Sequence, residues 1–242
     1  MDCFVITCEH GGNRIPPAYR RYFSPFKSLL QTHRGWDPGA LEMARELAKA
    51  FGAPCVSSEV SRLVVDLNRS NGHPRQFFDA VPVDPPTIRA EIVAKHWAPY
   101  RCEVESLVSE AVDRKHRVIH IASHSFTPVL DGQVRNADVG LLYDPGRPDE
   151  VALCGRWKAA IHSIEPALRV RRNYPYLGKH DGLTAHLRKR FSPRSYIGIE
   201  LEINHDTVFG PVPRWKVLRR TIIDSLRAST EPQTSVIRKN SQ

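Results

Sequence analysis

Four short polar clusters, each at the end or in the middle of an apolar run, contain the residues best suited to chemistry. They are Glu9-His10-Gly11-Gly12, Asp66-Leu67-Asn68-Arg69, Ser123-His124-Ser125 and Gly198-Ile199-Glu200-Leu201-Glu202. Two histidines at strand ends, with carboxylates elsewhere, can supply the nitrogen and oxygen ligands of a zinc site with one open position. Each histidine taken alone is more often a hydrogen-bonded core or loop residue, and the chain has no H-E-x-x-H or C-x-x-C motif. The clusters therefore indicate a metal site without establishing one.

Strand alternation predicts which way the acids in these clusters point. In the apolar run 196–203, Glu200 and Glu202 share one face, and the isoleucines and Leu201 share the other. An acid in an apolar strand costs free energy unless it is paired or used. Two interpretations remain open for these acids: a functional carboxylate, or an edge strand with a solvated acidic face. Glu9 is expected to point away from His10 if the backbone stays extended.

Apolar runs bounded by polar or glycine-containing segments predict the elements that position these clusters. Strands are expected at residues 3–8, 54–57, 63–66, 118–122, 139–143, 168–172 and 196–203. Helices are expected at residues 40–51, from the proline-rich passage 81–86 to about residue 116 with a break or kink at Pro99, and at 150–164, 183–191 and 212–228. Strands that alternate with helices predict an α/β fold with a largely parallel central sheet. In such a fold ligands bind outside the carboxyl ends of the strands, where the polar clusters fall.

The chain has 242 residues, of which 41% are hydrophobic and 25% charged, values that are ordinary for a globular protein. No polar or Gly/Ser-rich stretch divides it, so we expect a single catalytic domain over residues 1–229 and a flexible polar tail over residues 230–242. No apolar run approaches the roughly 18 residues that a membrane span needs. Asp2 stands where an export signal would have cations, and the five scattered cysteines suit a reducing compartment. We therefore expect a cytoplasmic protein with no membrane partner.

The net charge of +9 is compatible with nucleic acid, an anionic membrane surface or small acidic substrates. The cations lie in separate groups at residues 169–172, 188–190 and 219–220, with acids and aromatics between them, which is typical of a solvated face. The sequence has no RRM, zinc-finger or helix-turn-helix pattern. The charge therefore does not favour a nucleic-acid partner, and a basic nucleic-acid-binding protein is kept only as the alternative from another functional class.

Together the four clusters resemble the N-formylglutamate amidohydrolase family, in the same order and over nearly the whole chain. The chain is also similar, more distantly, to zinc carboxypeptidases and aspartoacylases, which implies one domain of three layers: a mixed, largely parallel sheet with helices on both faces. The most specific part is Arg62 followed by Asp66-Leu67-Asn68-Arg69, similar to the segment with which aspartoacylase-like enzymes hold a substrate carboxylate. Gly198-Ile199-Glu200 resembles the strand that carries their catalytic glutamate, and His124 matches their second metal-binding histidine.

The metal ligands that this resemblance implies depart from the carboxypeptidase pattern at one position. Those enzymes use His-x-x-Glu, whereas here Asn13 stands three residues after His10, and an amide oxygen is a poor ligand for zinc. N-formylglutamate amidohydrolases instead have an acid further downstream, and Asp37 stands in the comparable place. The expected ligands are therefore His10, Asp37 and His124. Asn13 and Glu202 are alternatives to Asp37, whose rival role is that of a helix cap.

The resemblance implies a metal-dependent amidohydrolase, with zinc as the expected metal, that cleaves a small acidic N-acyl amide such as N-formylglutamate. It implies that Glu200 transfers a proton from water to the leaving amine. It also implies that Arg62, Asn68 and Arg69 bind the substrate's carboxylate. Tyr176, in a loop similar to one near the family's site, is a candidate for a further hydrogen bond to substrate. The alternative in the same superfamily is a zinc peptidase or amidase acting on another peptide-like amide.

Overall fold

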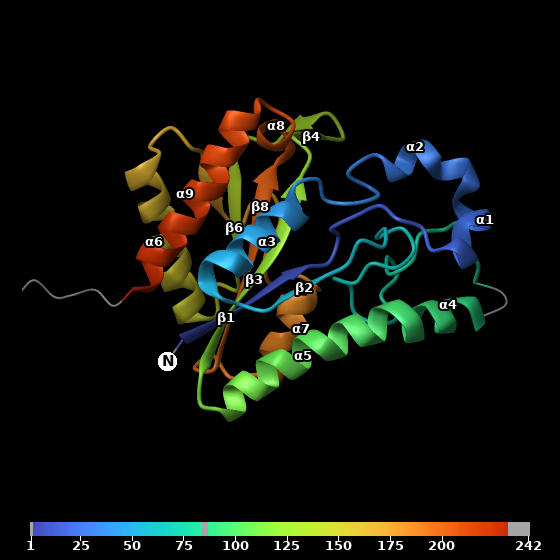
Figure 1. Cartoon of the computed structure of the whole chain (residues 1–242), viewed down its shortest axis with the longest axis horizontal. Coiled ribbons are helices and arrows are strands. Elements are labelled where there is room, and N and C mark those ends of the chain that lie inside the picture. Colours follow the sequence, from blue (N-terminus) through green and yellow to red (C-terminus); the bar gives the residue numbers. More distant parts are fainter. Residues whose placement is uncertain (1, 84–86, 232–242) are drawn as a thin grey trace, which may run out of the picture.

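The computed structural model describes residues 2–83 and 87–231 and contains a central six-stranded sheet (Figure 1). The spatial order of the strands is β2 (Cys55–Ser57), β1 (Asp2–Cys8), β3 (Arg117–Phe126), β8 (Tyr196–Asn204), β6 (Val139–Leu142) and β7 (Val170–Arg172). The first four are parallel, β6 runs antiparallel to β8, and β7 is parallel to β6. The prediction of a mixed, largely parallel sheet is confirmed.

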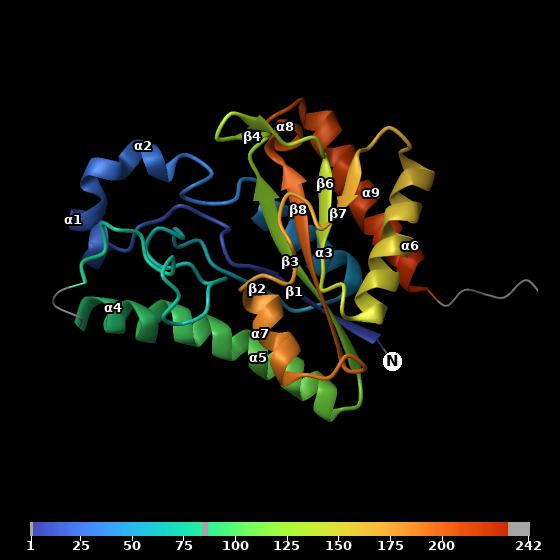
Figure 2. The ribbon, with the colours of Figure 1, turned by 180° about the vertical axis from the view of Figure 1, so that it is seen from behind.

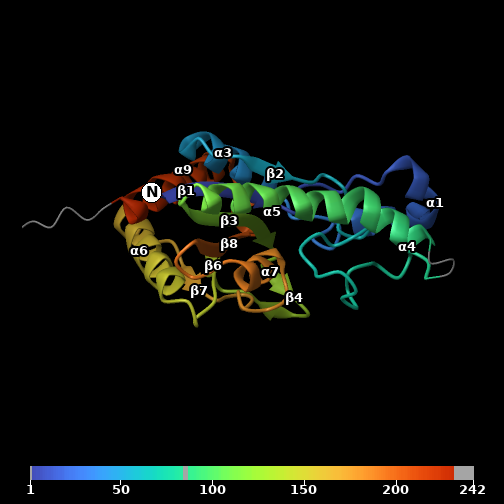
Figure 3. The same ribbon diagram turned by 90° about the horizontal axis from the view of Figure 1, so that it is seen from below.

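Helices cover both faces of the sheet, as expected. The helices α3 (Ala40–Phe51), α6 (Pro148–Ile164) and α9 (Val212–Thr230) pack on one face around one apolar core, and Figure 2 shows α6 and α9 side by side. The helices α5 (Ala98–Asp113) and α7 (Leu183–Arg190) pack around a second core on the other face, and Figure 3 shows α5 running beside β1 and β3. Alternating side chains of each strand enter the two cores: in β3, Ile119 and Ile121 enter the first and Val118 the second.

Shorter elements connect these layers. Two short helices, α1 (Arg20–Phe23) and α2 (Lys27–Leu30), follow β1, each preceded by a 3₁₀ turn, Pro17–Tyr19 and Ser24–Phe26. Helix α4 (Thr87–Ile92) continues through a π-helical turn (Val93–Trp97) into α5. A hairpin of β4 (Val129–Leu130) and β5 (Gln133–Val134) follows β3, and α8 (His205–Val208) follows β8. Among the described helices, none is long and apolar enough to cross a membrane.

Three expectations differ from the structure. Residues 63–66 form the end of a turn followed by irregular backbone and not a strand, with the Val64 N–H donating to the Ser61 carbonyl at 2.9 Å. Their apolar side chains enter the second core all the same, because burial does not require an extended backbone. The disruption predicted at Pro99 takes the form of a π-helical turn just before it, and Pro99 lies at the start of α5, where its missing N–H cannot bond to that turn. The tail predicted over residues 230–242 begins inside α9, and residues 232–242 lie outside the described residues.

Candidate metal centre

The carboxyl edge of the sheet brings together three residues from separate parts of the chain. His10 follows the end of β1 by two residues, His124 lies near the end of β3, and Asp37 lies in the loop before α3. Because β1 and β3 are parallel neighbours, both histidines emerge at the same edge. The Asp37 N–H donates to the His10 carbonyl at 2.9 Å, and Gly39, with φ of 79°, turns the chain into α3. Sheet topology and a local turn thus bring the three predicted ligands to one place.

We call the residues His10, Asp37 and His124 the triad. Their polar side-chain atoms face one another. His124 Nδ1 lies 2.9 Å and His10 Nδ1 lies 3.3 Å from Asp37 Oδ2. One potential ligand atom from each residue lies within 4.8 Å of the other two, and all three residues are buried. Two imidazole nitrogens and one carboxylate oxygen are a donor set typical of catalytic zinc sites, which keep a fourth position open. The residues present therefore fit a divalent transition metal.

The alternatives to Asp37 are placed differently. The side-chain amide of Asn13 donates to the Leu30 carbonyl at 3.1 Å and to Gln31 Oε1 at 3.2 Å. Glu202 does not belong to the group of described side chains whose ligand atoms converge. The carboxylate of Asp37 makes no capping hydrogen bond to α3, whose N-cap residue is Gly39. The structure thus brings Asp37 to the histidines and does not use it as the helix cap.

The pKa values of the triad show how strongly its members interact. Burial alone would raise the pKa of Asp37, but the neighbouring His10 and His124 hold that pKa far below its usual range. Burial alone would lower the pKa of His124, but hydrogen bonds to Asp37 and Glu9 raise it well above its usual value. Both shifts have the same origin, the attraction between buried carboxylates and the imidazoles beside them. A bound divalent metal ion would likewise compensate the negative charge of the buried carboxylates.

The other ring nitrogen of each histidine faces a second carboxylate. His10 Nε2 lies 2.7 Å from Asp66 Oδ1, and His124 Nε2 lies 3.1 Å from Glu9 Oε2. A carboxylate at this position orients an imidazole ligand and fixes its tautomer. The sequence pattern indicated no such role for either acid, and Glu9 was expected to point away from His10. That expectation depended on an extended backbone, but β1 ends at Cys8 and residues 9 and 10 form a turn. Glu9 therefore contacts His124 while its neighbour His10 belongs to the triad.

The two glutamates of β8 share one face of the strand, as alternation predicted, and His124 of β3 lies on the same face of the sheet. Glu202 is the direct register partner of His124, is 4% exposed, and has an Oε2 with no hydrogen-bond partner among the described residues. Burial, reinforced by Asp37 and Glu200, raises the pKa of Glu202 to about 8. Glu200, two residues earlier, is half-buried and accepts a 2.7 Å hydrogen bond from Thr184 Oγ1. Since β8 is an interior strand, the interpretation of an edge strand with a solvated acidic face is wrong.

Arg62 connects the carboxylates around the triad. Its Nη2 donates to Asp66 Oδ2 at 2.7 Å, and its Nη1 donates to Asp37 Oδ1 at 3.3 Å. The Arg62 side chain is 27% exposed, whereas both carboxylates are nearly inaccessible. Arg62 therefore neutralises part of the buried negative charge and also reaches the outside of the site.

The other residues expected to bind substrate are partly engaged with the protein. Asn68 Oδ1 accepts a 2.7 Å hydrogen bond from the first N–H of α7, and Arg69 Nη1 donates to the Asp181 carbonyl at 2.6 Å. The hydroxyl of Tyr176, a residue that is 45% exposed, accepts from Arg135 Nη1 at 3.0 Å. The Arg135 guanidinium also lies 4.9 Å from the centre of the tyrosine ring. These contacts hold each side chain in place and leave its role toward a substrate as a prediction.

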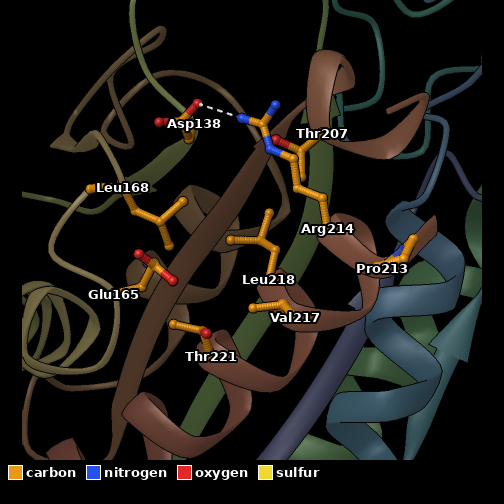
Figure 4. Close-up of a pocket in the computed structure, with 10 residues that line it drawn as sticks. Asp138, Glu165, Leu168, Thr207, Pro213, Arg214, Val217, Leu218 and Thr221 are labelled. Atoms are coloured by element: carbon orange, nitrogen blue, oxygen red, sulfur yellow. Dashed lines mark ion pairs between the residues drawn. The ribbon is translucent and has the colours of Figure 1, made fainter. Parts of the chain in front are cut away.

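Two cavities in the described structure are lined by residues other than the triad. One, of about 340 Å³, lies between the beginning of α9, α8 and residues 165–168, with Leu168 and Val217 in its apolar wall (Figure 4). The other, of about 480 Å³, lies beside α3. Neither is lined by a triad residue. Because Arg62 and Tyr176 are the more exposed groups around the buried triad, we expect substrate to approach from their side.

An α/β sheet that gathers two histidines and a carboxylate at its carboxyl edge has the architecture and donor set typical of metal-dependent hydrolases. The chain belongs to the N-formylglutamate amidohydrolase family, whose sequence model matches residues 2–209. It is therefore a hydrolase that acts on the carbon–nitrogen bonds of linear amides, as the motif order predicted.

Solved structures show the same fold over nearly the whole chain. The gene product Atu2144 from Agrobacterium tumefaciens is 28% identical, with a TM-score of 0.77 over 94% of this chain and 92% of that chain. An N-formylglutamate amidohydrolase from Ralstonia eutropha JMP134 is 16% identical, with a TM-score of 0.66 over 93% of this chain and 92% of that chain. No curated protein matches the sequence. The two structures confirm the predicted architecture.

Proposed function

We propose that this protein is a zinc-dependent amidohydrolase that cleaves an N-acyl amino acid with a free carboxylate, such as N-formylglutamate. Family membership supports hydrolysis of a linear amide, and the triad supports the metal. The convergence of two imidazole nitrogens and one carboxylate oxygen is the observation that carries the proposal. When bound, zinc would supply a Lewis acid that polarises the acyl oxygen and lowers the pKa of a water molecule.

Two carboxyl groups of β8 are available to move the proton during amide cleavage. Glu200 is the proposed group, because it is the more accessible of the two and the Thr184 hydroxyl holds one of its oxygens. Glu202 is the second candidate, because a carboxyl with a pKa of about 8 and a free oxygen beside His124 suits proton exchange near neutral pH. In either case the carboxylate takes a proton from the attacking water, the water oxygen bonds to the acyl carbon, and the amine leaves with that proton.

The substrate's carboxylate is proposed to meet Arg69 and Asn68, with Arg62 close by. A guanidinium has five N–H donors, so the bond from Arg69 Nη1 to the backbone leaves further donors for a ligand. Guanidinium groups hold carboxylates through two parallel hydrogen bonds, which a neutral substrate cannot match. Tyr176 is proposed to add a hydrogen bond from its hydroxyl. The net charge of +9 favours an acidic substrate in a general way.

We place the catalytic domain at residues 1–229 and the enzyme in the cytoplasm. The first apolar core combines elements from β1 to α9 and the second combines elements from β1 to β8, which supports a single domain. The five cysteines, all within the described residues, are free, which supports a reducing compartment.

Removal and restoration of the metal tests this proposal. Chelation is expected to abolish hydrolysis of N-formylglutamate, and added zinc to restore it, with formate release as the assay. His10→Ala and His124→Ala should lose most of the metal, because each removes one of three ligands. His186→Ala, a histidine that pairs with Glu105 away from the triad, is the matched control and should keep its zinc. Full hydrolysis by metal-free protein, or stoichiometric zinc in both triad variants, would contradict the proposal.

A substrate panel distinguishes this activity from the alternatives. We expect higher kcat/KM for N-formyl and N-acyl amino acids with a free carboxylate than for short peptides or peptidoglycan-like amides. The reverse order would identify a peptidase or amidase of the same superfamily. Salt-sensitive binding of DNA or RNA without bound metal would instead support the nucleic-acid alternative.

A further inference from the structure

A buried carboxylate that the proposed reaction does not use lies against the histidine of β3. Glu9 has no exposed surface, and its Oε2 lies 3.1 Å from His124 Nε2. Apart from this contact, neither atom has a polar partner in the part of the chain that the structure describes. We propose that Glu9 is a positioning residue that accepts the Nε2 proton of His124 and so presents Nδ1 to the metal. This inference rests on the proposed metal site.

Sheet register places Glu9 beside His124. The parallel pairing of β1 with β3 aligns Thr7 with Ala122. His124 lies two residues further along β3, and Glu9 lies in the turn that begins where β1 ends at Cys8. The contact is therefore a consequence of strand pairing and not of a flexible surface side chain.

Other contacts hold the Glu9 carboxylate in this position. The Tyr100 hydroxyl of α5 donates to Oε1 at 2.9 Å, which leaves Oε2 toward the imidazole. The backbone just before Glu9 is anchored as well, because the Ser58 N–H donates to the Cys8 carbonyl at 3.0 Å. Glu9 is thus fixed from the side of α5 and from the end of β2.

The chemistry of the pair explains why a carboxylate is needed there. A fully buried carboxylate is costly unless a cation or a strong donor meets it, and His124 Nε2–H is such a donor. A proton kept on Nε2 leaves the lone pair on Nδ1, the nitrogen that faces Asp37. With the opposite tautomer, the Nδ1 proton would block the metal. The adjacent residues Glu9 and His10 therefore have different roles: His10 is itself a metal ligand, and Glu9 orients the other histidine ligand, His124.

Zinc affinity tests this role without depending on turnover. Competition with a chromophoric chelator is measured for the wild type, Glu9→Gln and Glu105→Gln. Glu105 Oε2 lies 3.2 Å from His186 Nε2, so its variant removes a carboxylate from a histidine far from the triad. We expect Glu9→Gln to weaken zinc binding by roughly 10–100-fold, the usual effect of losing a carboxylate behind an imidazole ligand. The visible absorption of the cobalt-substituted protein should shift in Glu9→Gln and stay unchanged in Glu105→Gln.

The possible outcomes separate this inference from the proposed function. A folded Glu9→Gln protein with wild-type zinc affinity and an unchanged cobalt spectrum would overturn the role of Glu9 and leave the metal site intact. A wild type that binds no zinc would overturn the metal site and this inference with it. If Glu9→Gln does not fold, the Tyr100→Phe variant tests the inference, because it removes the hydrogen bond that holds the Glu9 carboxylate but keeps the carboxylate itself. Weaker zinc binding in Tyr100→Phe then supports the inference, and unchanged binding overturns it.

Discussion

Removal of Arg69 should reduce activity toward acidic substrates far more than toward neutral ones. Arg69 lies in the turn that follows Asp66, half-buried, with one guanidinium nitrogen bonded to the Asp181 carbonyl. A charge-assisted hydrogen bond from the remaining donors to a substrate carboxylate contributes about 1.5–3 kcal/mol. Arg69→Ala should therefore lower kcat/KM for N-formylglutamate by roughly 10–150-fold. Against the same substrate with its carboxylates converted to amides, the loss should be much smaller.

Two further variants separate substrate binding from support of the fold. Arg69→Lys should recover only part of the loss, because an ammonium group cannot reproduce a two-pronged contact. Arg75→Ala removes an exposed cation from the same segment and should leave kcat/KM unchanged, which controls for the general effect of charge. Equal losses of Arg69→Ala on the charged and neutral substrates would refute the reasoning. Arg69 would then act through its bond to Asp181, as a support for the loop before α7.

Two other predictions concern proton transfer and pH. Glu200→Gln should keep its zinc and lower kcat by roughly 10²–10⁴-fold. If Glu202→Gln shows this loss instead, Glu202 is the residue that carries the proton. Normal turnover in both variants would exclude both assignments. His120 is fully buried, and burial lowers its pKa to about 4, below the roughly 6.5 of an unfolded histidine. Between these values only the unfolded chain binds the proton, so acidification lowers the free energy of unfolding by about 3 kcal/mol in total. Urea unfolding at about pH 7 and about pH 4 gives the free energy of unfolding that each protein loses on acidification. His120→Gln should lose about 3 kcal/mol less than the wild type, and equal losses would contradict a neutral His120 in the folded protein.

Local patterns predicted most of the elements but not how they pair. The apolar runs that became β1, β3 and β8 were recognisable because each is long enough, and bounded sharply enough, to read as a buried strand. Residues 63–66 share that composition but form a turn and irregular backbone, since apolar side chains can be buried without an extended strand. The antiparallel pairing of β6 with β8 was not predicted, because a strand's own sequence does not encode the direction of its neighbour.

The same limit applies to the site. His10 and His124 were noted because each stands at the end of an apolar run, and Asp37 was added because of its place in the family pattern. Glu9 was not assigned a role, because its partner lies on a strand more than a hundred residues away in the sequence. Knowledge that β1 pairs with β3 would have been needed to place it.

The register of three parallel strands determines both the core and the site. One face of the sheet carries His124 of β3 beside Glu202 of β8, and the pairing of Thr7 with Ala122 brings Glu9, just after the end of β1, next to His124. On the other face the same strands carry the apolar side chains of the first core. A shift of one residue in β3 would turn His124 toward that core and bring its neighbouring serines to the triad. Burial of the isoleucines of β3 therefore also keeps His124 beside Asp37, so the hydrophobic pattern that stabilises the sheet positions the candidate metal ligands as well.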